Sequence, residues 1–231
     1  MTKDRNPSIA ESTAPAGEPT RADQTRATLI RAALRLFGTR GFDGTSTRDI
    51  AAAANANIGS IAYHFGGKEG LRTACAGFIV DTIGAIAGQA LDAAPAAGPE
   101  AATAGLETAL ERLVGFLIAQ PQAGEIVQFI LRELAHPTAA LDIIYDGVFE
   151  PTHKRLCVIW GAATGEDPES DEAKLAVFTM IGQVIYFRIA REAVMRRMGW
   201  TSIGQNEAAA VIAATKANLT AILAARRNRN P

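Results

Sequence analysis

The sequence predicts an all-α protein, with an N-terminal three-helix helix-turn-helix domain followed by a larger helical-bundle domain. Apolar residues recur at spacings of three and four along most of the chain. Two short helices joined by a tight turn are predicted between Thr45 and Lys68, and Pro/Gly breaks divide the remainder into longer helices. A chain of 231 residues allows one large or two small domains; we expect a disordered tail at 1–23, the helix-turn-helix domain at 24–67 and the helical body at 68–231.

The N-terminal part of the chain changes from a tail to a helix near residue 24. Residues 1–23 are rich in Pro, Ser, Thr, Ala and Gly, a composition typical of disorder. The first helix is predicted from Gln24 to Thr39, and Gly38 and Gly41 mark its end. Its broad apolar stripe predicts that it packs onto a core, and consists of Leu29, Ile30, Ala33, Leu34, Leu36 and Phe37.

The next segment carries the local signals of a helix-turn-helix unit. Ser46 and Asp49 have the spacing of a capping box, in which each side chain accepts a hydrogen bond from the other residue's backbone amide. Asn55 lies where the chain must turn, and Asn tolerates a left-handed backbone better than most residues. Asn57 is then predicted to cap a second short helix, from Ile58 to Phe65.

One face of this second short helix is nearly bare. Its small residues are Gly59, Ser60 and Ala62. Such a face suits a helix that lies against a flat partner, and the major groove of B-DNA admits one helix. Tyr63, His64 and Lys68 place a hydroxyl, an imidazole and an ammonium group at the edge, where phosphates run. A helix-turn-helix used only for packing is the alternative.

The charge distribution points the same way. Residues 20–70 carry seven basic and four acidic side chains, a net charge of +3, while the whole chain has a net charge of -1. A basic N-terminal segment on an acidic body is expected of a DNA-binding head. Ordinary scatter of charge along the chain is the alternative interpretation.

A specific pattern of residues runs from Phe37 to Leu71. It consists of Phe37, Gly41, Phe42, Thr45, Ser46, Thr47, Ile50 and Ala51, then Tyr63, His64, Phe65, Lys68, Glu69 and Leu71. This pattern resembles the TetR family of bacterial transcription regulators. The family often has Gly, a polar residue and Tyr where this chain has Asn55, Ile58 and Ala62. The resemblance implies a regulator that binds double-stranded DNA.

The predicted DNA contacts follow from this interpretation. Each protomer of a dimer would place its second short helix in a major groove, so that the pair binds a palindromic operator. The residues predicted to lie nearest the bases are Asn57, Gly59 and Ser60. The residues predicted to hold phosphates are Thr45, Thr47, Arg48, Tyr63, His64 and Lys68.

The body is predicted to be helical throughout. Its first helix, Lys68 to Leu91, begins in the head, so a shift at its far end would move the DNA-contacting helix. A Pro/Gly break follows at Asp92 to Gly98. Further helices are predicted at 100–119, 124–135, 139–161 with a kink at Pro151, 171–198 and 205–226, with an acidic loop at 165–170.

The last two predicted helices indicate a homodimer. The centre of 171–198 is apolar nearly all round, so this helix must be buried on more than one side. Together with 205–226 it would expose a large apolar face on a monomer. Pairing across a two-fold axis into a four-helix bundle would cover that face, and Gly182 permits another helix to approach closely. The resemblance supports this prediction, because TetR-family proteins commonly dimerise through their last two helices.

Residues 126–156 are similar to the C-terminal domain of the CecR-type subgroup, which implies that the body binds a small-molecule effector. Aromatic and polar side chains are mixed on its helices, as they are in ligand sites. The predicted ligand-binding residues are Phe116, Phe129, Arg132, His136, Tyr145, Phe149, His153, Phe178, Gln183 and Tyr186. For each of them, filling the core or forming a salt link is the alternative.

Two other functions stay open: a metal-dependent helical-bundle enzyme, and a DNA-binding protein without a ligand. Glu133 and His136 have the E-x-x-H spacing of di-iron helices, but those proteins need this motif twice with two further glutamates. No catalytic triad signature, Walker loop or G-x-G-x-x-G motif is found, so no catalytic residue, metal or cofactor is predicted.

The remaining features predict a cytoplasmic protein that does not contact a membrane. Cys75 and Cys157 are the only cysteines, and free thiols in a reducing compartment are the simplest interpretation. The N-terminus lacks the apolar stretch of a signal peptide. The longest apolar run, Leu175 to Phe187, is shorter than the roughly 20 residues of a membrane span.

Overall fold

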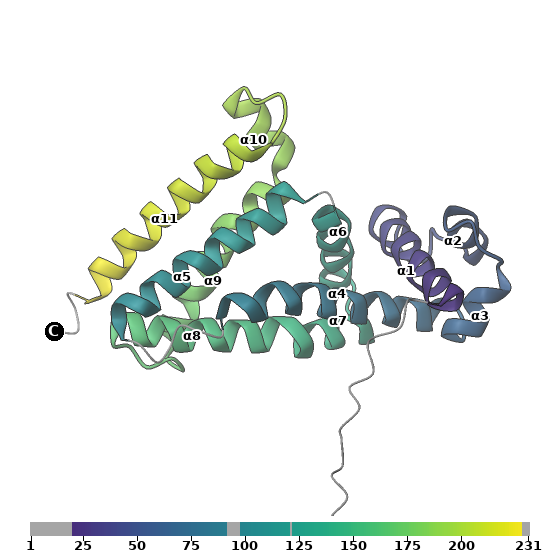
Figure 1. The fold of residues 1–231 in the computed structure, drawn as a ribbon, viewed down its shortest axis with the longest axis horizontal. Coiled ribbons are helices and arrows are strands. Elements are labelled where there is room, and N and C mark those ends of the chain that lie inside the picture. Colours follow the sequence, from purple (N-terminus) through teal and green to yellow (C-terminus); the bar gives the residue numbers. More distant parts are fainter. Residues whose placement is uncertain (1–19, 92–97, 121, 228–231) are drawn as a thin grey trace, which may run out of the picture.

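The computed structural model describes residues 20–91, 98–120 and 122–227. All the regular secondary structure within these ranges is helical (Figure 1). The predicted all-α class is confirmed. Most of the predicted tail and residues 92–97 of the predicted break lie outside the described residues. The α-helices are α1 (Arg21–Arg40), α2 (Thr47–Ala53), α3 (Gly59–Phe65), α4 (Lys68–Leu91), α5 (Pro99–Val114), α6 (Gln122–Ala135), α7 (Ala139–Ile144), α8 (Glu150–Thr164), α9 (Asp171–Ile189), α10 (Arg191–Met198) and α11 (Gln205–Arg227).

The first three helices form a head at one end of the molecule (Figure 1). Their buried side chains come from the predicted apolar stripe of α1 together with Ile50 of α2 and Ile61 of α3. The ring of Phe42 lies 5.3 Å from that of Phe37, centroid to centroid, and packs against the same core. The apolar stripe of α1 therefore packs onto a core, as predicted, and aromatic rings are part of that core.

The first helix begins three residues before its predicted start. Thr20 is its N-cap: the Thr20 hydroxyl accepts from the Asp23 amide at 3.2 Å, and the Asp23 carboxylate accepts from the Thr20 amide at 3.0 Å. This T-x-x-D spacing is the same capping-box signal that starts α2. The start signal of α1 is therefore present in the sequence. The Pro- and Ser-rich composition of the preceding residues led to a predicted start that is three residues too late.

Helix α4 joins the head to the body, and its bounds are those predicted. It packs against α1 and α3 at its N-terminal end and against α5, α7 and α8 further along. Leu71, Cys75 and Ile79 are fully buried on its inner face. One continuous helix thus belongs to both parts of the molecule.

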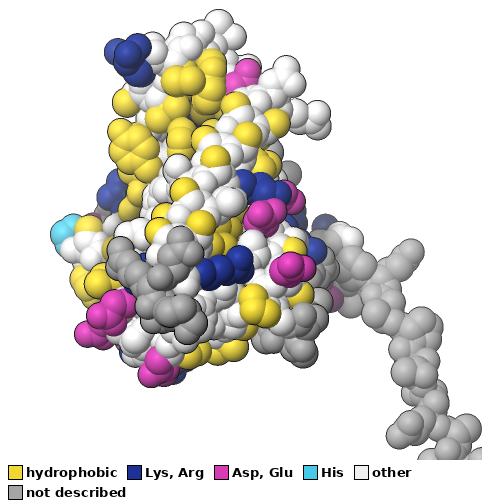
Figure 2. Space-filling model, turned by 90° about the vertical axis from the view of Figure 1, so that its left-hand side faces the viewer, with side chains coloured by type: hydrophobic (Ala, Val, Ile, Leu, Met, Phe, Trp, Pro, Cys, Tyr) yellow, Lys and Arg dark blue, Asp and Glu magenta, His cyan; other side chains and the backbone are white. Residues whose placement is uncertain are grey.

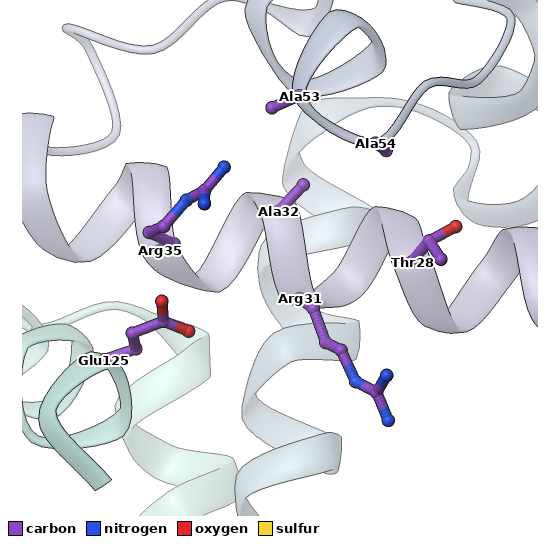
Figure 3. A pocket seen from close by; sticks show the side chains of 7 residues that line it. All are labelled: Thr28, Arg31, Ala32, Arg35, Ala53, Ala54 and Glu125. Carbon is purple, nitrogen blue, oxygen red and sulfur yellow. The ribbon is translucent and has the colours of Figure 1, made fainter. Parts of the chain in front are cut away.

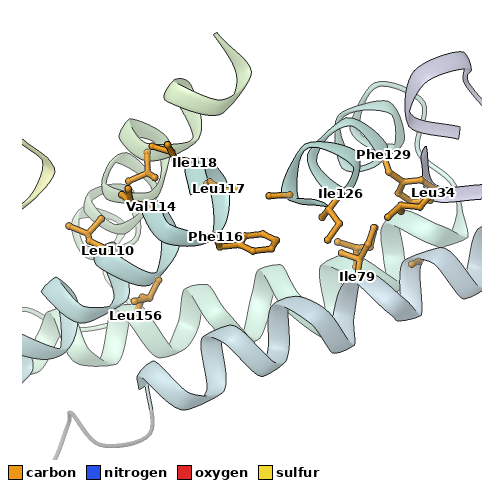
Figure 4. Packing of buried hydrophobic residues seen from close by; sticks show 14 of the residues in the cluster. Leu34, Ile79, Leu110, Val114, Phe116, Leu117, Ile118, Ile126, Phe129 and Leu156 are labelled. Carbon is orange, nitrogen blue, oxygen red and sulfur yellow. The ribbon is translucent and has the colours of Figure 1, made fainter. Parts of the chain in front are cut away.

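Helix α6 provides a second connection between body and head, because it packs directly across α1. Figure 4 shows Leu34 of α1, Ile79 of α4, and Ile126 and Phe129 of α6 meeting in one apolar cluster. Gly38 lets the two backbones approach closely, since a Cβ there would lie 3.2 Å from the Cβ of Gln128. The apolar core is therefore continuous from the head into the body.

Arg132 of α6 fastens this contact with hydrogen bonds. Its Nε donates to the Gly38 carbonyl at 2.6 Å and its Nη2 donates to the Thr39 carbonyl at 2.9 Å. Carbonyls in the last turn of a helix lack partners within the helix, and a cation there also complements the helix dipole. Arg132 therefore holds the C-terminal end of α1 from the body.

Two π-helical segments interrupt the α-helical hydrogen bonding of the body. The segment η2 (Gly115–Ala119) extends α5, and η3 (Tyr145–Phe149) joins α7 directly to α8. The helix predicted at 139–161 is thus continuous along the chain, with a π-helical turn ending two residues before Pro151. Proline has no amide proton to donate, which is one reason why helical hydrogen bonding changes at this place.

The helix predicted at 171–198 is wrong as a single element. The chain bends by 78° between α9 and α10, at Ala190, whose backbone has left the helical region (φ -95°, ψ 24°). Neither Gly nor Pro stands at the bend, and the apolar period continues across it. Local signals therefore gave no reason to divide the segment.

Replacing Arg132 by Met should loosen the head from the body. The variant keeps an unbranched side chain of similar length but cannot form the two charge-assisted hydrogen bonds, so we expect the free energy of unfolding to fall by about 1–2 kcal/mol. Urea denaturation followed by circular dichroism measures this change. Arg197→Met, at an exposed position of α10, is the matched control. Equal stability of the two variants would show that the Arg132 contact contributes nothing.

Candidate DNA interface and effector site

The capping box at the start of α2 is present as predicted. The Ser46 hydroxyl accepts from the Asp49 amide at 3.1 Å, and the Asp49 carboxylate accepts from the Ser46 amide at 3.0 Å. The Ser46 side chain and amide together lower the pKa of Asp49 below its ordinary value, because both donate hydrogen bonds to the ionised carboxylate. The start of α2 is thereby fixed against the head core.

The turn between α2 and α3 uses the two predicted asparagines. Asn55 has φ +49°, the left-handed conformation expected of it. The Asn57 Oδ1 accepts from the Gly59 amide at 2.8 Å, so its side chain satisfies one of the first free amides of α3. The helix itself begins at Gly59, one residue after the predicted Ile58.

Helix α3 presents its small-residue face to solvent while Ile61 is buried on the opposite face. Asn57 and Gly59 are exposed, and Ser60 is half-buried. Tyr63 projects at the far end of this face with 84% of its side chain accessible. The predicted base-facing residues thus lie together on one surface that a DNA duplex could approach.

Of the six predicted phosphate-binding residues, five are exposed or half-buried and one, Thr45, is buried. Arg48 is exposed, and Thr47, His64 and Lys68 are half-buried beside α3. The Lys68 ammonium lies 4.0 Å from the centre of the Phe42 ring, which holds its stem in place.

The structure contradicts the prediction that Thr45 holds a phosphate. Its side chain is buried, with 1% exposed, and its hydroxyl donates to the carbonyls of Leu36 at 3.2 Å and Gly41 at 2.7 Å. The hydroxyl therefore holds the loop to the end of α1 and is not available to a phosphate. Burial of a short polar residue by a distant segment could not be read from its own position.

One cation beside α3 was not predicted. The Arg26 guanidinium of α1 lies over the Phe65 ring, 5.6 Å from its centre, and so stands next to the end of α3. Its position on the polar side of α1 was visible in the sequence. Which helix that side faces depends on how α1 and α3 pack.

Of the ten predicted ligand-binding residues, only Gln183 lines one of the two hollows described below, and the others differ in burial and position. Phe116 and Phe129 are buried in the core, Phe149 and His153 are half-buried, and Arg132 binds the end of α1. The members on exposed surfaces are His136, Tyr145, Phe178 and Tyr186. The rings of His153 and Phe178 stack, with 3.9 Å between centroids, and are the one stacked pair among the ten in the described part of the chain.

Two open hollows are present instead. One, of about 300 Å³, lies between α9 and α11 and includes Gln183 from the predicted set; its other lining residues are Thr179, Met180, Asn218, Ala221 and Ile222. The other, of about 220 Å³, lies where α1, α2 and α6 meet. Figure 3 shows Arg31 and Arg35 of α1 in it with Glu125 of α6.

The two residues of the E-x-x-H pair differ in burial. Glu133 is buried, and its carboxylate accepts from the Thr138 hydroxyl and lies 3.6 Å from the Arg72 guanidinium. His136 is exposed. Glu133 therefore has a structural role between α4 and α6. Within the ranges that the structure describes, no three acidic, His or Cys side chains are placed to hold a metal ion.

By length and composition alone, α11 could cross a membrane, and only 28% of its apolar window is buried. In this fold it packs along α5, α8 and α9, and Lys216 on it pairs with Glu107 and Glu111 of α5, both at 2.8 Å. Its apolar side is therefore largely open in this single chain.

The fold and the exposed face of α3 together define a helix-turn-helix DNA-binding regulator with a helical body. Residues 29–75 match the model of the bacterial regulatory proteins of the tetR family. Residues 102–226 match the C-terminal domain of the HTH-type transcriptional dual regulator CecR. The chain belongs to the TetR family, with a CecR-type C-terminal domain, and is a transcriptional regulator that binds DNA.

Individual relatives agree with this assignment. The chain is 34% identical over 193 residues to the HTH-type transcriptional dual regulator CecR of Shigella flexneri, covering 81% of this chain and 86% of that protein. It is 39% identical over 66 residues to the HTH-type transcriptional repressor Rv3405c of Mycobacterium tuberculosis, covering 29% of this chain and 33% of that protein.

Solved structures share the fold. A TetR-like transcriptional regulator from Rhodococcus sp. RHA1 has a TM-score of 0.61 at 20% identity, covering 87% of this chain and 98% of that one. AibR in complex with isovaleryl coenzyme A and operator DNA has a TM-score of 0.57 at 20% identity, covering 71% of this chain and 85% of that one.

The position of Lys68 leads to a prediction about salt. Lys68→Ala should weaken binding to all duplexes, because an interaction with a phosphate carries no sequence information. It should also reduce the slope of log K against log salt by about 0.9 for each phosphate that is no longer neutralised, hence by about 2 in a symmetric dimer. Fluorescence anisotropy across a salt series measures both effects. Lys154→Ala, in an exposed ion pair of the body, is the control; a slope unchanged in Lys68→Ala would contradict the phosphate-binding role.

Proposed function

We propose that this regulator is a cytoplasmic homodimeric repressor that a small molecule releases from a palindromic operator. The observation that carries the proposal is the exposed small-residue face of α3, attached through α4 to a body with a large open apolar surface. The first feature suits a major groove and the second suits a two-fold partner. Repression follows from occlusion of a promoter.

In this proposal α3 of each protomer enters a major groove, with Asn57, Gly59 and Ser60 nearest the bases. The residues that hold the flanking phosphates are Thr47, Arg48, Tyr63, His64 and Lys68, and Arg26 adds a cation from α1. Phosphate contacts fix the position of α3 on the duplex, and base contacts supply the specificity. The short side chains of α3 let its backbone approach the base edges closely.

Two connections would transmit an effector signal to the DNA. Helix α4 is shared by head and body, and α6 holds the end of α1 through Arg132. A ligand that binds one arrangement of these helices better than another shifts the population toward it. Moving the two heads away from a half-site spacing of about 34 Å would release the operator.

The dimer interface would be formed by α9 and α11. Leu175, Phe178, Gly182, Tyr186 and Ile189 share one face of α9, and the four large side chains among them are 54–64% exposed. Figure 2, which views the end of the molecule where α11 lies, shows hydrophobic side chains along this region and gathered near α10. Exposed apolar surfaces of this kind mark protein, membrane or ligand contacts, and a second protomer is the partner that this proposal assigns to it.

The test of the function uses the full-length protein and the inverted repeat expected upstream of its own gene. We expect this duplex to be bound at least about a thousandfold more tightly than a scrambled duplex at about 0.15 M salt, in line with the usual ratio of specific to non-specific binding. An effector should weaken specific binding by about 5- to 150-fold. Absence of any preference would reject a specific regulator, and a broad effector screen with no weakening would favour regulation without a ligand.

Gly182→Glu should break the dimer. The carboxylate would lie at the centre of the α9 face, where an unpaired charge loses its hydration when a partner helix approaches. Analytical ultracentrifugation should therefore report a monomer, and operator affinity should fall because the two half-sites are no longer read together. Gly84→Glu, at an exposed position of α4 away from this face, is the control. A persisting dimer would exclude this interface.

A further inference from the structure

A large aliphatic side chain of the head is left in contact with water. Ile58, the residue directly before α3, is 46% exposed. All of residues 20–67 are described in the structure, and every other leucine or isoleucine among them is at most 7% exposed. These buried residues are Leu29, Ile30, Leu34, Leu36, Ile50 and Ile61. The head core therefore takes in its large aliphatic residues with the exception of Ile58.

The turn before α3 holds Ile58 in a fixed conformation. The Asn57 Oδ1 accepts from the Gly59 amide at 2.8 Å. The Ile58 carbonyl accepts from the Ile61 amide at 3.1 Å, and Ile58 has the backbone angles of a helix (φ -57°, ψ -35°). A β-branched side chain has one strongly preferred rotamer on a helical backbone. The side chain of Ile58 is thus ordered in advance and loses little conformational freedom when it meets a partner.

The neighbours of Ile58 on α3 leave it uncovered. Gly59 has no side chain, and Ala62, four residues further on and on the same side of the helix, has only a methyl group. A single exposed isoleucine is common on protein surfaces, so its position decides the interpretation. Ile58 borders the small-residue face of α3 at its N-terminal end, whereas Tyr63 projects at the far end.

The major groove contains one kind of apolar group that suits such a side chain. In a helix-turn-helix protein the N-terminal residues of the second helix contact the base edges. Isoleucine neither donates nor accepts a hydrogen bond, so against a polar base edge it would remove water without replacing the lost hydrogen bonds. The C5-methyl group of thymine is the apolar group that base pairs present in this groove.

We propose that Ile58 is a specificity-determining residue that packs against the C5-methyl group of one thymine in each half-site of the operator. This inference rests on the proposed function, in which α3 enters a major groove. The apolar contact of Ile58 adds to the readout by Asn57, Gly59 and Ser60. It favours thymine at one position and disfavours the other bases there, because they lack the methyl group.

The experiment uses the duplex that the full-length protein selects from a random library at about 0.15 M salt. Each half-site of this duplex should contain a thymine at a fixed position. Thymines are replaced in turn by deoxyuridine, in both half-sites together, because deoxyuridine keeps the hydrogen-bonding groups and lacks only the methyl. At one position the wild type should lose affinity about fourfold per half-site, hence about 15-fold for the duplex, as expected for one buried methyl group in each. Fluorescence anisotropy measures the affinities.

Ile58→Ala should remove this discrimination. The variant should bind the selected duplex more weakly than the wild type does, and at that position thymine and deoxyuridine should be bound equally. Because Ile58 is exposed, the melting temperature should stay close to that of the wild type. Val158→Ala, at an equally exposed position of α8, is the matched control and should retain the 15-fold ratio. Comparing both proteins on both duplexes separates the contact from any effect of deoxyuridine on the DNA alone.

Three results would overturn the role of Ile58. They are a selected duplex without a fixed thymine, a wild type that is insensitive to deoxyuridine at every thymine, and undiminished discrimination in Ile58→Ala.

The failure of this inference is distinguishable from failure of the proposed function. If the discrimination depends on Ile58 but no compound weakens operator binding, release by a small molecule fails and the thymine contact stands. If a compound releases the selected duplex while deoxyuridine is bound as tightly as thymine throughout, the proposed function stands and the role of Ile58 is rejected. A selection that yields no preferred duplex rejects both.

Discussion

The contact of α6 with α1 is the constraint on which the rest of the structure depends. Gly38 allows the two helices to approach, and Arg132 ties its guanidinium to the last carbonyls of α1. Because the apolar cluster of Leu34, Ile79 and Phe129 spans the same contact, the head cannot turn freely about α4. A change in the body that moves α6 must therefore either move the head or break these hydrogen bonds and the packing.

The small-residue face of α3 is exposed because the packing that supports this helix lies on its other side. Ile61 anchors the helix in the head core, and the turn before it is fixed by the left-handed Asn55 and the Asn57 hydrogen bond. Phe42 has the cations of Lys68 and Arg72 within 4.0 Å and 3.7 Å of its ring centre, which places positive charge beside α3. The same small core thus positions both the exposed face of α3 and the cations at its edge.

Several polar groups of the body have structural partners. Glu133 is held by Thr138 and Arg72, and Lys216 joins α11 to α5. The exposed α9 face departs from this pattern, because large apolar side chains remain in contact with water. The second protomer proposed above would cover this face.

The sequence by itself determined the features whose causes lie within a few residues. The Ser46 capping box, the Asn55 turn and the bounds of α4 follow from interactions at spacings of one to four, and so could be predicted from the residue pattern. The family resemblance also supplied the two-part organisation.

Only the tertiary structure decided which side of each element is used. Thr45 was expected at phosphates, but nine residues separate it from Leu36, whose carbonyl holds its hydroxyl. Arg132 was expected in a ligand pocket, but its partner Gly38 is 94 residues away. The bend at Ala190 and the exposure of Phe178 and Tyr186 likewise depend on packing between distant segments. Periodicity identifies an apolar side chain, but it does not show whether the cover comes from the same chain, a ligand or a second copy, because that depends on how helices far apart in sequence are arranged.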